Sequence, residues 1–348
     1  MTETLETLAT EKLALFPEES NAHLPHRRHL IDLDDWTPYE VQRLLDRAAY
    51  MRDVLADPTR RLETLRGRLA VTLFYENSTR TRISFELAAK KLGADVTNMT
   101  AAASSVTKGE SLRDTVETLQ ALGANILIVR SSQSGAPDVI TRYFRGAVVN
   151  AGDGWRGHPT QALLDALTLQ LRFGTLANRH IVIVGDILHS RVARSNIWSL
   201  TALGAEVVLC APPTLTPPNV ADAYTSRPVP GTGAQRRVTV EPRIERALEG
   251  ADVVMALRLQ RERQQAGLLP SLREYTMRYG LTMERLQLTK PCALVLHPGP
   301  MNEGIEIDPD VAHSAYSLVE EQVTNGVATR MAALEMIGLA MGTVGTAQ

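Results

Sequence analysis

A cluster of hydroxyl and guanidinium groups follows an apolar run that ends at Tyr75. The run reads "LAVTLFY", and the next residues, E-N-S-T-R-T-R, bring Ser78, Thr79, Arg80 and Thr81 into direct succession. Hydroxyls and backbone N–H groups at a helix start favour anions, and a guanidinium forms paired hydrogen bonds with phosphate. A hydroxyl helix cap followed by a solvated arginine is the plainer alternative. The spacing favours a phosphate site where a buried strand meets a helix.

Other apolar runs also end in polar groups that suit a carbonyl or an anion. "NILIVR" ends at Arg130, and a charge at the end of a buried strand needs an ion-pair partner or a ligand. "HPTQ" places His158 directly before Pro159, a favoured first helical residue, with Gln161 close behind. A neutral imidazole there can donate to a carbonyl oxygen, and the amide can donate and accept. Taken alone, His158 and Gln161 could be ordinary loop residues.

Arginines follow two later runs, and a proline–glycine turn follows a third. "HIVIVGD" leads to Arg191 and Arg194, and "DVVMAL" leads to "RLQRER", where an extended chain puts Arg258 and Gln260 on one face. "CALVLH" leads to the turn at 298–300, whose backbone carbonyls could face a ligand. Because ligands bind at the carboxyl ends of parallel strands, six such ends predict a deep pocket for more than one acidic group.

Composition and missing motifs exclude several other classes of protein. Lys plus Arg number 37 against 39 Asp plus Glu, and this net charge of -2 argues against a general nucleic-acid surface. The chain has no G-x-G-x-x-G, no P-loop, no G-x-S-x-G elbow and no carboxylate cluster for Mg²⁺. Cys210 and Cys292 lack zinc-site spacing, and we expect both to be reduced and buried. With no signal peptide and no apolar run near the ~18 residues of a membrane span, we expect a cytoplasmic protein with no membrane contact.

Short apolar runs that alternate with helix-like segments must position these residues. The runs are 68–75, 124–130, 146–152, 180–186, 205–211, 251–257 and 292–298. The helix-like segments are 79–92, 111–122, 159–173, 191–203 and 243–249. Runs of Val, Ile and Leu without alternation are typical of parallel strands covered on both faces. The pattern predicts an α/β fold with doubly wound parallel sheets.

The order of these segments predicts two domains with the active site in the cleft between them. We place the first domain at 1–165 and the second at 166–311, joined by long helices. The C-terminal region, about 312–348, is expected to supply an amphipathic helix that packs back on the first domain. The segment 211–237 is rich in proline, glycine, serine and threonine, which predicts a long surface loop.

The motif series resembles that of the carbamoyltransferases. "FYENSTRTRISFE", "SSVTKGESLRDT", "HPTQALLD", "LRLQRER" and "HPGPMNEGIEI" occur in the family's order, across about residues 24–340. S-T-R-T-R together with H-P-T-Q is specific to that superfamily. The "TKGES", "RLQRER" and "HPGP" segments resemble the aspartate carbamoyltransferase catalytic chains, whereas the ornithine enzymes carry H-C-L-P at the last position. Gly299 stands where many relatives have leucine, and the segment 211–237 extends past the family core.

The resemblance implies a role for each matching residue. The carbamoyl phosphate site would comprise Ser78, Thr79, Arg80, Thr81, Arg130, His158, Gln161, Pro298, Gly299 and Pro300. The L-aspartate site would comprise Lys108, Arg191, Arg258 and Gln260. The catalytic groups would be Arg80, Thr81, Lys108, Arg130 and His158. Ser104, Ser105 and Lys108 would lie on a loop that reaches into the site of a neighbouring subunit.

The resemblance also implies a reaction and an assembly. The aspartate enzymes of the family transfer the carbamoyl group of carbamoyl phosphate to the α-amine of L-aspartate, the committed step of pyrimidine biosynthesis, by direct attack without a cofactor, a metal or a covalent intermediate. A homotrimer with shared active sites is implied, and some relatives also bind a regulatory chain or dihydroorotase.

Three alternatives to this reaction stay open. One is a carbamoyltransferase for another amino acid, although two arginines for the second substrate favour a dicarboxylate. Another is a phosphometabolite-binding protein without catalysis. The third, a dehydrogenase, is disfavoured by the missing glycine fingerprint.

Overall fold

The fold contains two parallel β-sheets, each covered by helices. A computed structural model describes residues 24–100, 111–259 and 268–342. Within these ranges the strand orders are β2-β1-β3-β4 and β7-β6-β5-β8-β9, and every neighbouring pair is parallel. The predicted class, two α/β units with parallel sheets, is confirmed. The strand order reverses direction between β1 and β3 in the first sheet and between β5 and β8 in the second. In parallel sheets, ligands bind outside the carboxyl ends of the strands at such points.

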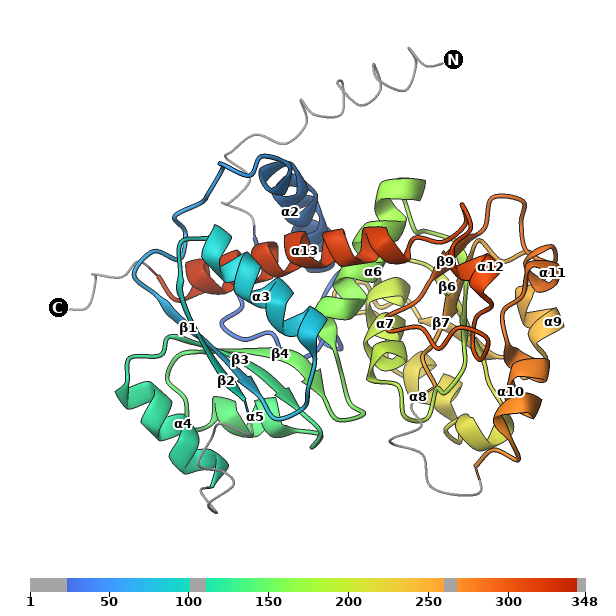
Figure 1. The fold of residues 1–348 in the computed structure, drawn as a ribbon, viewed down its shortest axis with the longest axis horizontal. Helices are drawn as coiled ribbons and strands as arrows, with labels where there is room; N and C mark the ends of the chain where they lie inside the picture. Colours follow the sequence, from blue (N-terminus) through green and yellow to red (C-terminus); the bar gives the residue numbers. More distant parts are fainter. Residues whose placement is uncertain (1–23, 101–110, 260–267, 343–348) are drawn as a thin grey trace, which may run out of the picture.

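The first sheet is built from the N-terminal half of the chain. Its strands are β1 (Leu69–Phe74), β2 (Asp95–Thr100), β3 (Ile126–Ser131) and β4 (Ala147–Asp153). Its helices are α2 (Pro38–Ala56), α3 (Thr79–Lys91), α4 (Leu112–Ala121) and α5 (Ala136–Thr141). Helices α4 and α5 cover one face, and α2 and α3 lie over the other (Figure 1). Strands β3 and β4 are buried along their whole length, because helices cover both faces.

The second sheet begins at the apolar run "HIVIV". Its strands are β5 (His180–Val184), β6 (Glu206–Cys210), β7 (Arg237–Val240), β8 (Val253–Ala256) and β9 (Leu294–Leu296). Its helices are α7 (Arg191–Ala202), α8 (Val220–Thr225), α9 (Ile244–Leu248), α10 (Leu272–Tyr279), α11 (Met283–Leu286) and α12 (Pro309–Ala312).

Two long helices connect the units. Helix α6 (Pro159–Phe173) packs against α7, and α13 (Val319–Ala340) packs against α2, α3 and α6 and runs across both units (Figure 1). The prediction of an amphipathic C-terminal helix is wrong, because the turns from 328 to 338 are buried on every face. A buried ion pair of 2.6 Å between Arg47 and Glu335 fixes α13 to α2. The exact residues at which one domain ends and the other begins stay a prediction.

Two further expectations need correction. The segment 211–237 is not a plain loop: it holds the 3₁₀ turn η4 (Pro213–Leu215) and α8, whose Tyr224 packs on Trp198 with ring centroids 4.4 Å apart. Cys210 is buried as expected, but Cys292 is exposed because it lies in the turn just before β9. In the described ranges, no helix is both long enough and apolar enough to cross a membrane.

Candidate active site

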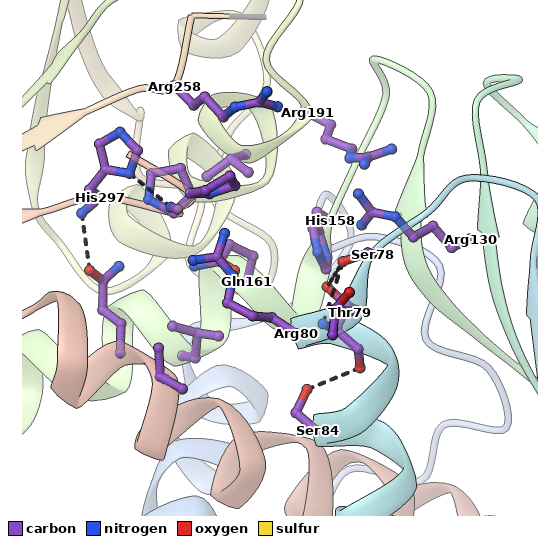
Figure 2. A pocket seen from close by; sticks show the side chains of 18 of the residues that line it. Ser78, Thr79, Arg80, Ser84, Arg130, His158, Gln161, Arg191, Arg258 and His297 are labelled. Atoms are coloured by element: carbon purple, nitrogen blue, oxygen red, sulfur yellow. Dashed lines mark hydrogen bonds between the residues drawn. The ribbon is translucent and has the colours of Figure 1, made fainter. Parts of the chain in front are cut away.

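A cavity of ≈790 Å³ lies where the carboxyl ends of the two sheets face each other (Figure 2). Every described residue of the predicted substrate sites lines it. These residues are Ser78, Thr79, Arg80, Thr81, Arg130, His158, Gln161, Arg191, Arg258, Pro298, Gly299 and Pro300. Lys108, Ser104, Ser105 and Gln260 lie outside the described residues. Residues at or after the ends of β1, β3 and β4 thus meet residues that follow β5, β8 and β9 in one space.

The hydroxyl cluster forms the N-terminus of α3. Ser78 is the N-cap in an extended conformation, and its hydroxyl accepts a hydrogen bond from the N–H of Thr81 at 3.4 Å and donates to the Thr81 hydroxyl at 3.0 Å. The plainer alternative, a hydroxyl helix cap, is therefore present in the structure. It does not compete with anion binding, because residues 78–81 line the cavity and a helix N-terminus favours anions.

Arg80 lies in the cavity beside a second cation. Burial lowers the pKa of Arg80, and the nearby charge of Arg258 lowers it further. A guanidinium stays protonated in proteins, so the two charges repel until an anion binds between them. Gly299 makes room for this arrangement: a Cβ there would overlap the guanidinium of Arg80, and the backbone has φ +58°. A side chain at 299 would therefore require the Arg80 guanidinium to shift, and the positive φ also favours glycine.

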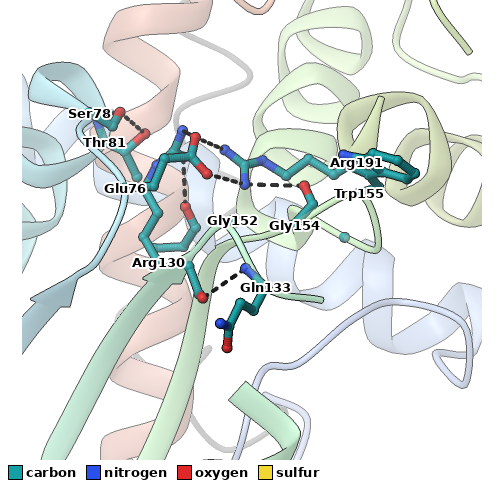
Figure 3. Close-up of polar contacts among 12 residues, drawn as sticks. Glu76, Ser78, Thr81, Arg130, Gln133, Gly152, Gly154, Trp155 and Arg191 are labelled. Carbon is teal, nitrogen blue, oxygen red and sulfur yellow. Dashed lines mark hydrogen bonds and ion pairs between the residues drawn. The ribbon is translucent and has the colours of Figure 1, made fainter. Parts of the chain in front are cut away.

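Arg130 and Arg191 share one carboxylate that the sequence analysis did not identify (Figure 3). Glu76 Oε1 accepts from Arg130 Nη2 at 2.8 Å and from Arg191 Nη2 at 2.7 Å, and its Oε2 accepts from Arg191 Nη1 at 3.0 Å. The structural ion pair considered for Arg130 is therefore present, although Arg130 also lines the cavity. Glu76 directly precedes the N-S-T-R-T-R segment, but nothing in its local sequence reveals a partner 115 residues away.

His158 and Gln161 begin α6, where a chain of polar contacts holds them. The N–H of His158 donates to Ser195 Oγ at 2.8 Å, and that hydroxyl donates to Asp32 Oδ1 at 2.7 Å. Gln161 Nε2 donates to Asp165 Oδ1 at 2.9 Å, one helical turn further along. Both side chains are nine-tenths buried or more. They are therefore fixed residues of the cavity wall and not the ordinary loop residues of the plainer alternative.

The turn at 298–300 is fixed by His297. The N–H of Gly299 donates to His297 Nδ1 at 2.8 Å, which makes that nitrogen an acceptor. A neutral His297 then carries its proton on Nε2 and donates it to Glu306 Oε1, 3.1 Å away. The backbone N–H of His297 donates to Gln322 Oε1 at 3.0 Å. The turn that faces Arg80 is thus tied to α13.

The cavity is strongly cationic. Arg80, Arg130, Arg191, Arg258 and Arg330 line it, and burial lowers the pKa of Arg330 to about 10. Five guanidiniums face one lining carboxylate, Glu76, among the described residues. Such a site can bind more than one anion and stabilise negative charge that develops on a substrate oxygen. In the described ranges, no group of three or more His, Cys, Asp or Glu side chains is placed to hold a metal ion.

Comparisons with known proteins agree with this geometry. Residues 28–171 match the family model of the aspartate/ornithine carbamoyltransferase carbamoyl-P binding domain, and residues 177–337 match that of the Asp/Orn binding domain. The aspartate carbamoyltransferase catalytic subunit of Chloroflexus aurantiacus is 58% identical over 308 residues, which cover 88% of this chain and 97% of the relative.

Two solved structures show the same fold. The aspartate transcarbamoylase of Trypanosoma cruzi in complex with carbamoyl phosphate and aspartate has TM-score 0.78 and 26% identity, covering 89% of this chain and 96% of its own. The ornithine carbamoyltransferase of Pyrococcus furiosus has TM-score 0.80 and 25% identity, covering 91% and 98%. With two family models spanning most of its length and relatives at this identity, the chain belongs to the aspartate/ornithine carbamoyltransferase family and, within it, to the aspartate carbamoyltransferase catalytic subunits.

Proposed function

We propose that this chain transfers the carbamoyl group of carbamoyl phosphate to the α-amine of L-aspartate, giving N-carbamoyl-L-aspartate and phosphate. The observation that carries the proposal is the pairing of two cationic ends in one cavity. Ser78, Arg80 and Thr81 come from the first unit, and Arg191 and Arg258 come from the second. A phosphate monoester and a dicarboxylate are the two anions that such ends would accept.

The phosphate end is the N-terminus of α3. Its N–H groups and the hydroxyls of Ser78, Thr79 and Thr81 would surround the phosphate oxygens, and Arg80 would add a paired hydrogen bond. Arg80 and Arg258 lie close enough for their charges to interact, so a bound dianion also relieves their repulsion.

The carbamoyl end lies between His158, Arg130 and the turn at 298–300. Arg130, Thr81 and His158 would donate to the carbamoyl oxygen, which becomes negative as the amine attacks. Backbone carbonyls of Pro298, Gly299 and Pro300, together with Gln161, would accept from the carbamoyl NH₂. These contacts hold the electrophile in place, and the donors to its oxygen make its carbon more electron-poor.

The aspartate end would use Arg191 and Arg258, with Gln260 and Lys108 added from segments outside the described residues. Glu76 bonds to Arg191 through both carboxylate oxygens. An aspartate carboxylate would replace part of this ion pair, so the charge of Arg191 stays compensated with and without substrate. Much of the rate gain would come from positioning the two substrates side by side.

The proposed chemical step balances without a further reactant. The nitrogen lone pair of aspartate attacks the carbamoyl carbon, and a tetrahedral oxyanion forms. The C–O bond to phosphate then breaks, and its electrons leave with the phosphate. The leaving phosphate takes the proton that the amine loses.

We further propose that the chain works as a homotrimer with shared sites, in the cytoplasm and in pyrimidine biosynthesis. Ser104, Ser105 and Lys108 would enter the cavity of the neighbouring subunit. A regulatory chain or dihydroorotase would be an additional partner on the basis of the family resemblance alone.

The experiment that tests the activity compares amino acid acceptors. Purified protein is supplied with ¹³C-labelled carbamoyl phosphate and with L-aspartate, L-ornithine or N-acetylornithine, and the products are identified by NMR. We expect carbamoyl-aspartate alone, because the guanidiniums of the second unit attract a dicarboxylate and repel the cationic side chain of ornithine. Turnover with ornithine and none with aspartate would refute the proposal. Tight binding without any turnover would favour a binding protein.

A further inference from the structure

Asp165 lies below the floor of the cavity and accepts hydrogen bonds from three amide side chains. Its Oδ1 accepts from Gln161 Nε2 at 2.9 Å and from Gln322 Nε2 at 2.7 Å, and its Oδ2 accepts from Asn196 Nδ2 at 2.8 Å. The three amides come from α6, α13 and α7, and Asp165 itself is fully buried. An ionised carboxylate can only accept hydrogen bonds, so it dictates that each amide presents its NH₂.

Two of these amides are also fixed at a second point. Gln322 Oε1 accepts from the N–H of His297 at 3.0 Å, and Asn196 Nδ2 also donates to the carbonyl of Val192 at 3.1 Å. Gln161 and Gln322 both line the cavity, but the oxygen of Gln322 already accepts from His297 (Figure 2). The nitrogen and oxygen of a planar amide point in opposite directions. With Nε2 directed at Asp165, Oε1 of Gln161 is left for the cavity.

We propose that Asp165 is a positioning residue that sets the hydrogen-bonding polarity of Gln161, so that the cavity presents an acceptor to the NH₂ of the carbamoyl group. This inference rests on the proposed function for the identity of the ligand. Asp165 does not touch substrate; it acts through Gln161. It thereby contributes to discrimination between a carbamoyl group and an acyl group that has no N–H.

The charge state of Asp165 supports this role. Burial raises the pKa of Asp165 to about 6, and the three amide donors and the charge of Arg330 limit the rise. The groups that face Asp165 are therefore Gln161 from α6, Asn196 from α7, and Gln322 and Arg330 from α13, of which Arg330 alone is charged. At pH 8 the carboxylate is ionised and accepts all three bonds. Below about pH 6 it carries a proton and can donate.

The substitution Asp165→Leu tests the inference, because it nearly keeps the shape and removes both acceptor oxygens. Gln161 and Gln322 both donate to Oδ1, so this substitution removes the acceptor that holds Nε2 of Gln161. Gln322 keeps its bond to the N–H of His297, whereas the amide of Gln161 can turn its NH₂ to the cavity. An acceptor replaced by a donor is expected to cost about tenfold in affinity for carbamoyl phosphate.

The readout is the ratio of two dissociation constants measured by calorimetry at pH 8 without aspartate. The ligands are carbamoyl phosphate and acetyl phosphate, in which a methyl group replaces the NH₂. We expect Asp165→Leu to lower the preference for carbamoyl phosphate by about tenfold, with acetyl phosphate affinity nearly unchanged. An unchanged ratio overturns the inference. Turnover of aspartate by the wild-type protein is scored separately, so failure of the inference leaves the proposed function intact.

Thr168→Val is the matched control. Thr168 is equally buried on α6, donates to the carbonyl of Leu164 at 2.7 Å and accepts from Asn325 Nδ2 on α13 at 2.8 Å. Its loss disturbs the same helix pair without touching Gln161, so the ratio should not change. An equal loss of preference in Thr168→Val would assign the effect to helix packing and contradict the inference.

Two further variants keep the test decisive. Asp165→Asn should retain most of the preference, because its amide oxygen can stay where Oδ1 accepts from Gln161 and Gln322, with its NH₂ toward Asn196. Asp165→Ala also removes the acceptor and replaces Asp165→Leu if that protein does not fold, and the same fall in the ratio is expected. A full preference in Asp165→Ala, or an equal loss in Asp165→Asn, would contradict the role of Asp165.

Discussion

At the scale of single residues, five guanidiniums and one lining carboxylate define the cavity among the described residues. Arg130 and Arg191 share Glu76, whereas Arg80 and Arg258 repel each other. A site with this imbalance gains most from a ligand that brings negative charge to Arg80. The anion-binding function therefore depends on Arg80 more than on its neighbours in the S-T-R-T-R motif.

We predict that Arg80→Ala lowers kcat/KM for carbamoyl transfer by roughly 10³-fold or more, because a charge-assisted paired contact to the phosphate is lost. Arg82→Ala is the matched control, since Arg82 lies two residues further along α3 and does not line the cavity. We expect it to stay within a few fold of the wild type. Steady-state kinetics and circular dichroism measure both. A loss in Arg80→Ala no larger than in Arg82→Ala would make Arg80 a structural residue.

Much of the candidate site was predictable from the sequence, because parallel strands bring their carboxyl ends to a shared edge. The motif residues Ser78, Arg130, His158 and Arg258 meet in one cavity for that reason. Glu76 and Asp165 were not identified, since each acts through partners that only the tertiary fold brings near. A carboxylate between a strand and a helix gives no local sign that it bridges two arginines.

At the scale of elements, the apolar runs predicted the buried strands well, whereas polar elements gave weaker signals. Strand β2 reads D-V-T-N-M-T and lies at the edge of its sheet, so it carries little apolar signal. Helix α2 begins with a capping box in which Thr37 and Glu40 cap each other, and this pattern is visible in the sequence. Helix α13 was predicted wrongly as amphipathic, because the polar residues Arg330 and Glu335, which resemble a solvent-exposed face in the sequence, are buried.

Asp153, the last residue of β4, should make the stability of the fold depend on pH. Asp153 is fully buried, and its Oδ1 accepts from the N–H of Gly135 at the start of α5 at 2.8 Å. Burial raises the pKa of Asp153 to about 6, above the 3.8 expected in the unfolded chain. The folded protein therefore holds a proton that the unfolded chain releases. The stabilising contribution is fully present below about pH 4 and is lost as the pH rises through about 6.

In the wild type, the free energy of unfolding should fall between pH 4 and pH 7 as Asp153 loses its proton. We predict that Asp153→Asn makes this fall smaller, by up to roughly 3 kcal/mol. Urea denaturation across this pH range measures it. Asp310→Asn, at an exposed position on α12, should leave the slope unchanged. A slope in Asp153→Asn that equals that of the wild type would show that Asp153 does not hold the extra proton.

At the scale of the whole molecule, the two sheet units are joined by contacts that also surround the cavity. Helix α13 runs across both units (Figure 1), and the ion pair between Glu76 and Arg191 crosses from one to the other. Trp155, after β4, lies edge-on against His189, before α7, with ring centroids 4.7 Å apart. A ligand that replaces Glu76 at Arg191 therefore changes how the units are held together.

If active sites are shared between subunits, two inactive variants should restore activity to each other. Arg80→Ala and Lys108→Ala should each be inactive, because each removes a different part of every shared site. In mixed trimers, some sites combine an intact Arg80 with an intact Lys108 from the neighbour. Activity should therefore return after the two inactive proteins are dissociated together and reassembled. If no mixture recovers activity while size measurements confirm hybrid trimers, Lys108 serves its own subunit.

The central claim is that one cavity binds both substrates at once, the phosphate near Arg80 and the dicarboxylate near Arg258. Its most direct test is the affinity of N-(phosphonacetyl)-L-aspartate, which links both anionic parts, measured by calorimetry beside phosphonoacetate and succinate. We predict that the linked compound binds at least about 10²-fold more tightly than either part, because the second contact becomes intramolecular. We also predict that Arg80→Ala and Arg258→Ala each abolish most of that gain. Equal affinity for the linked compound and for one part alone would contradict the account.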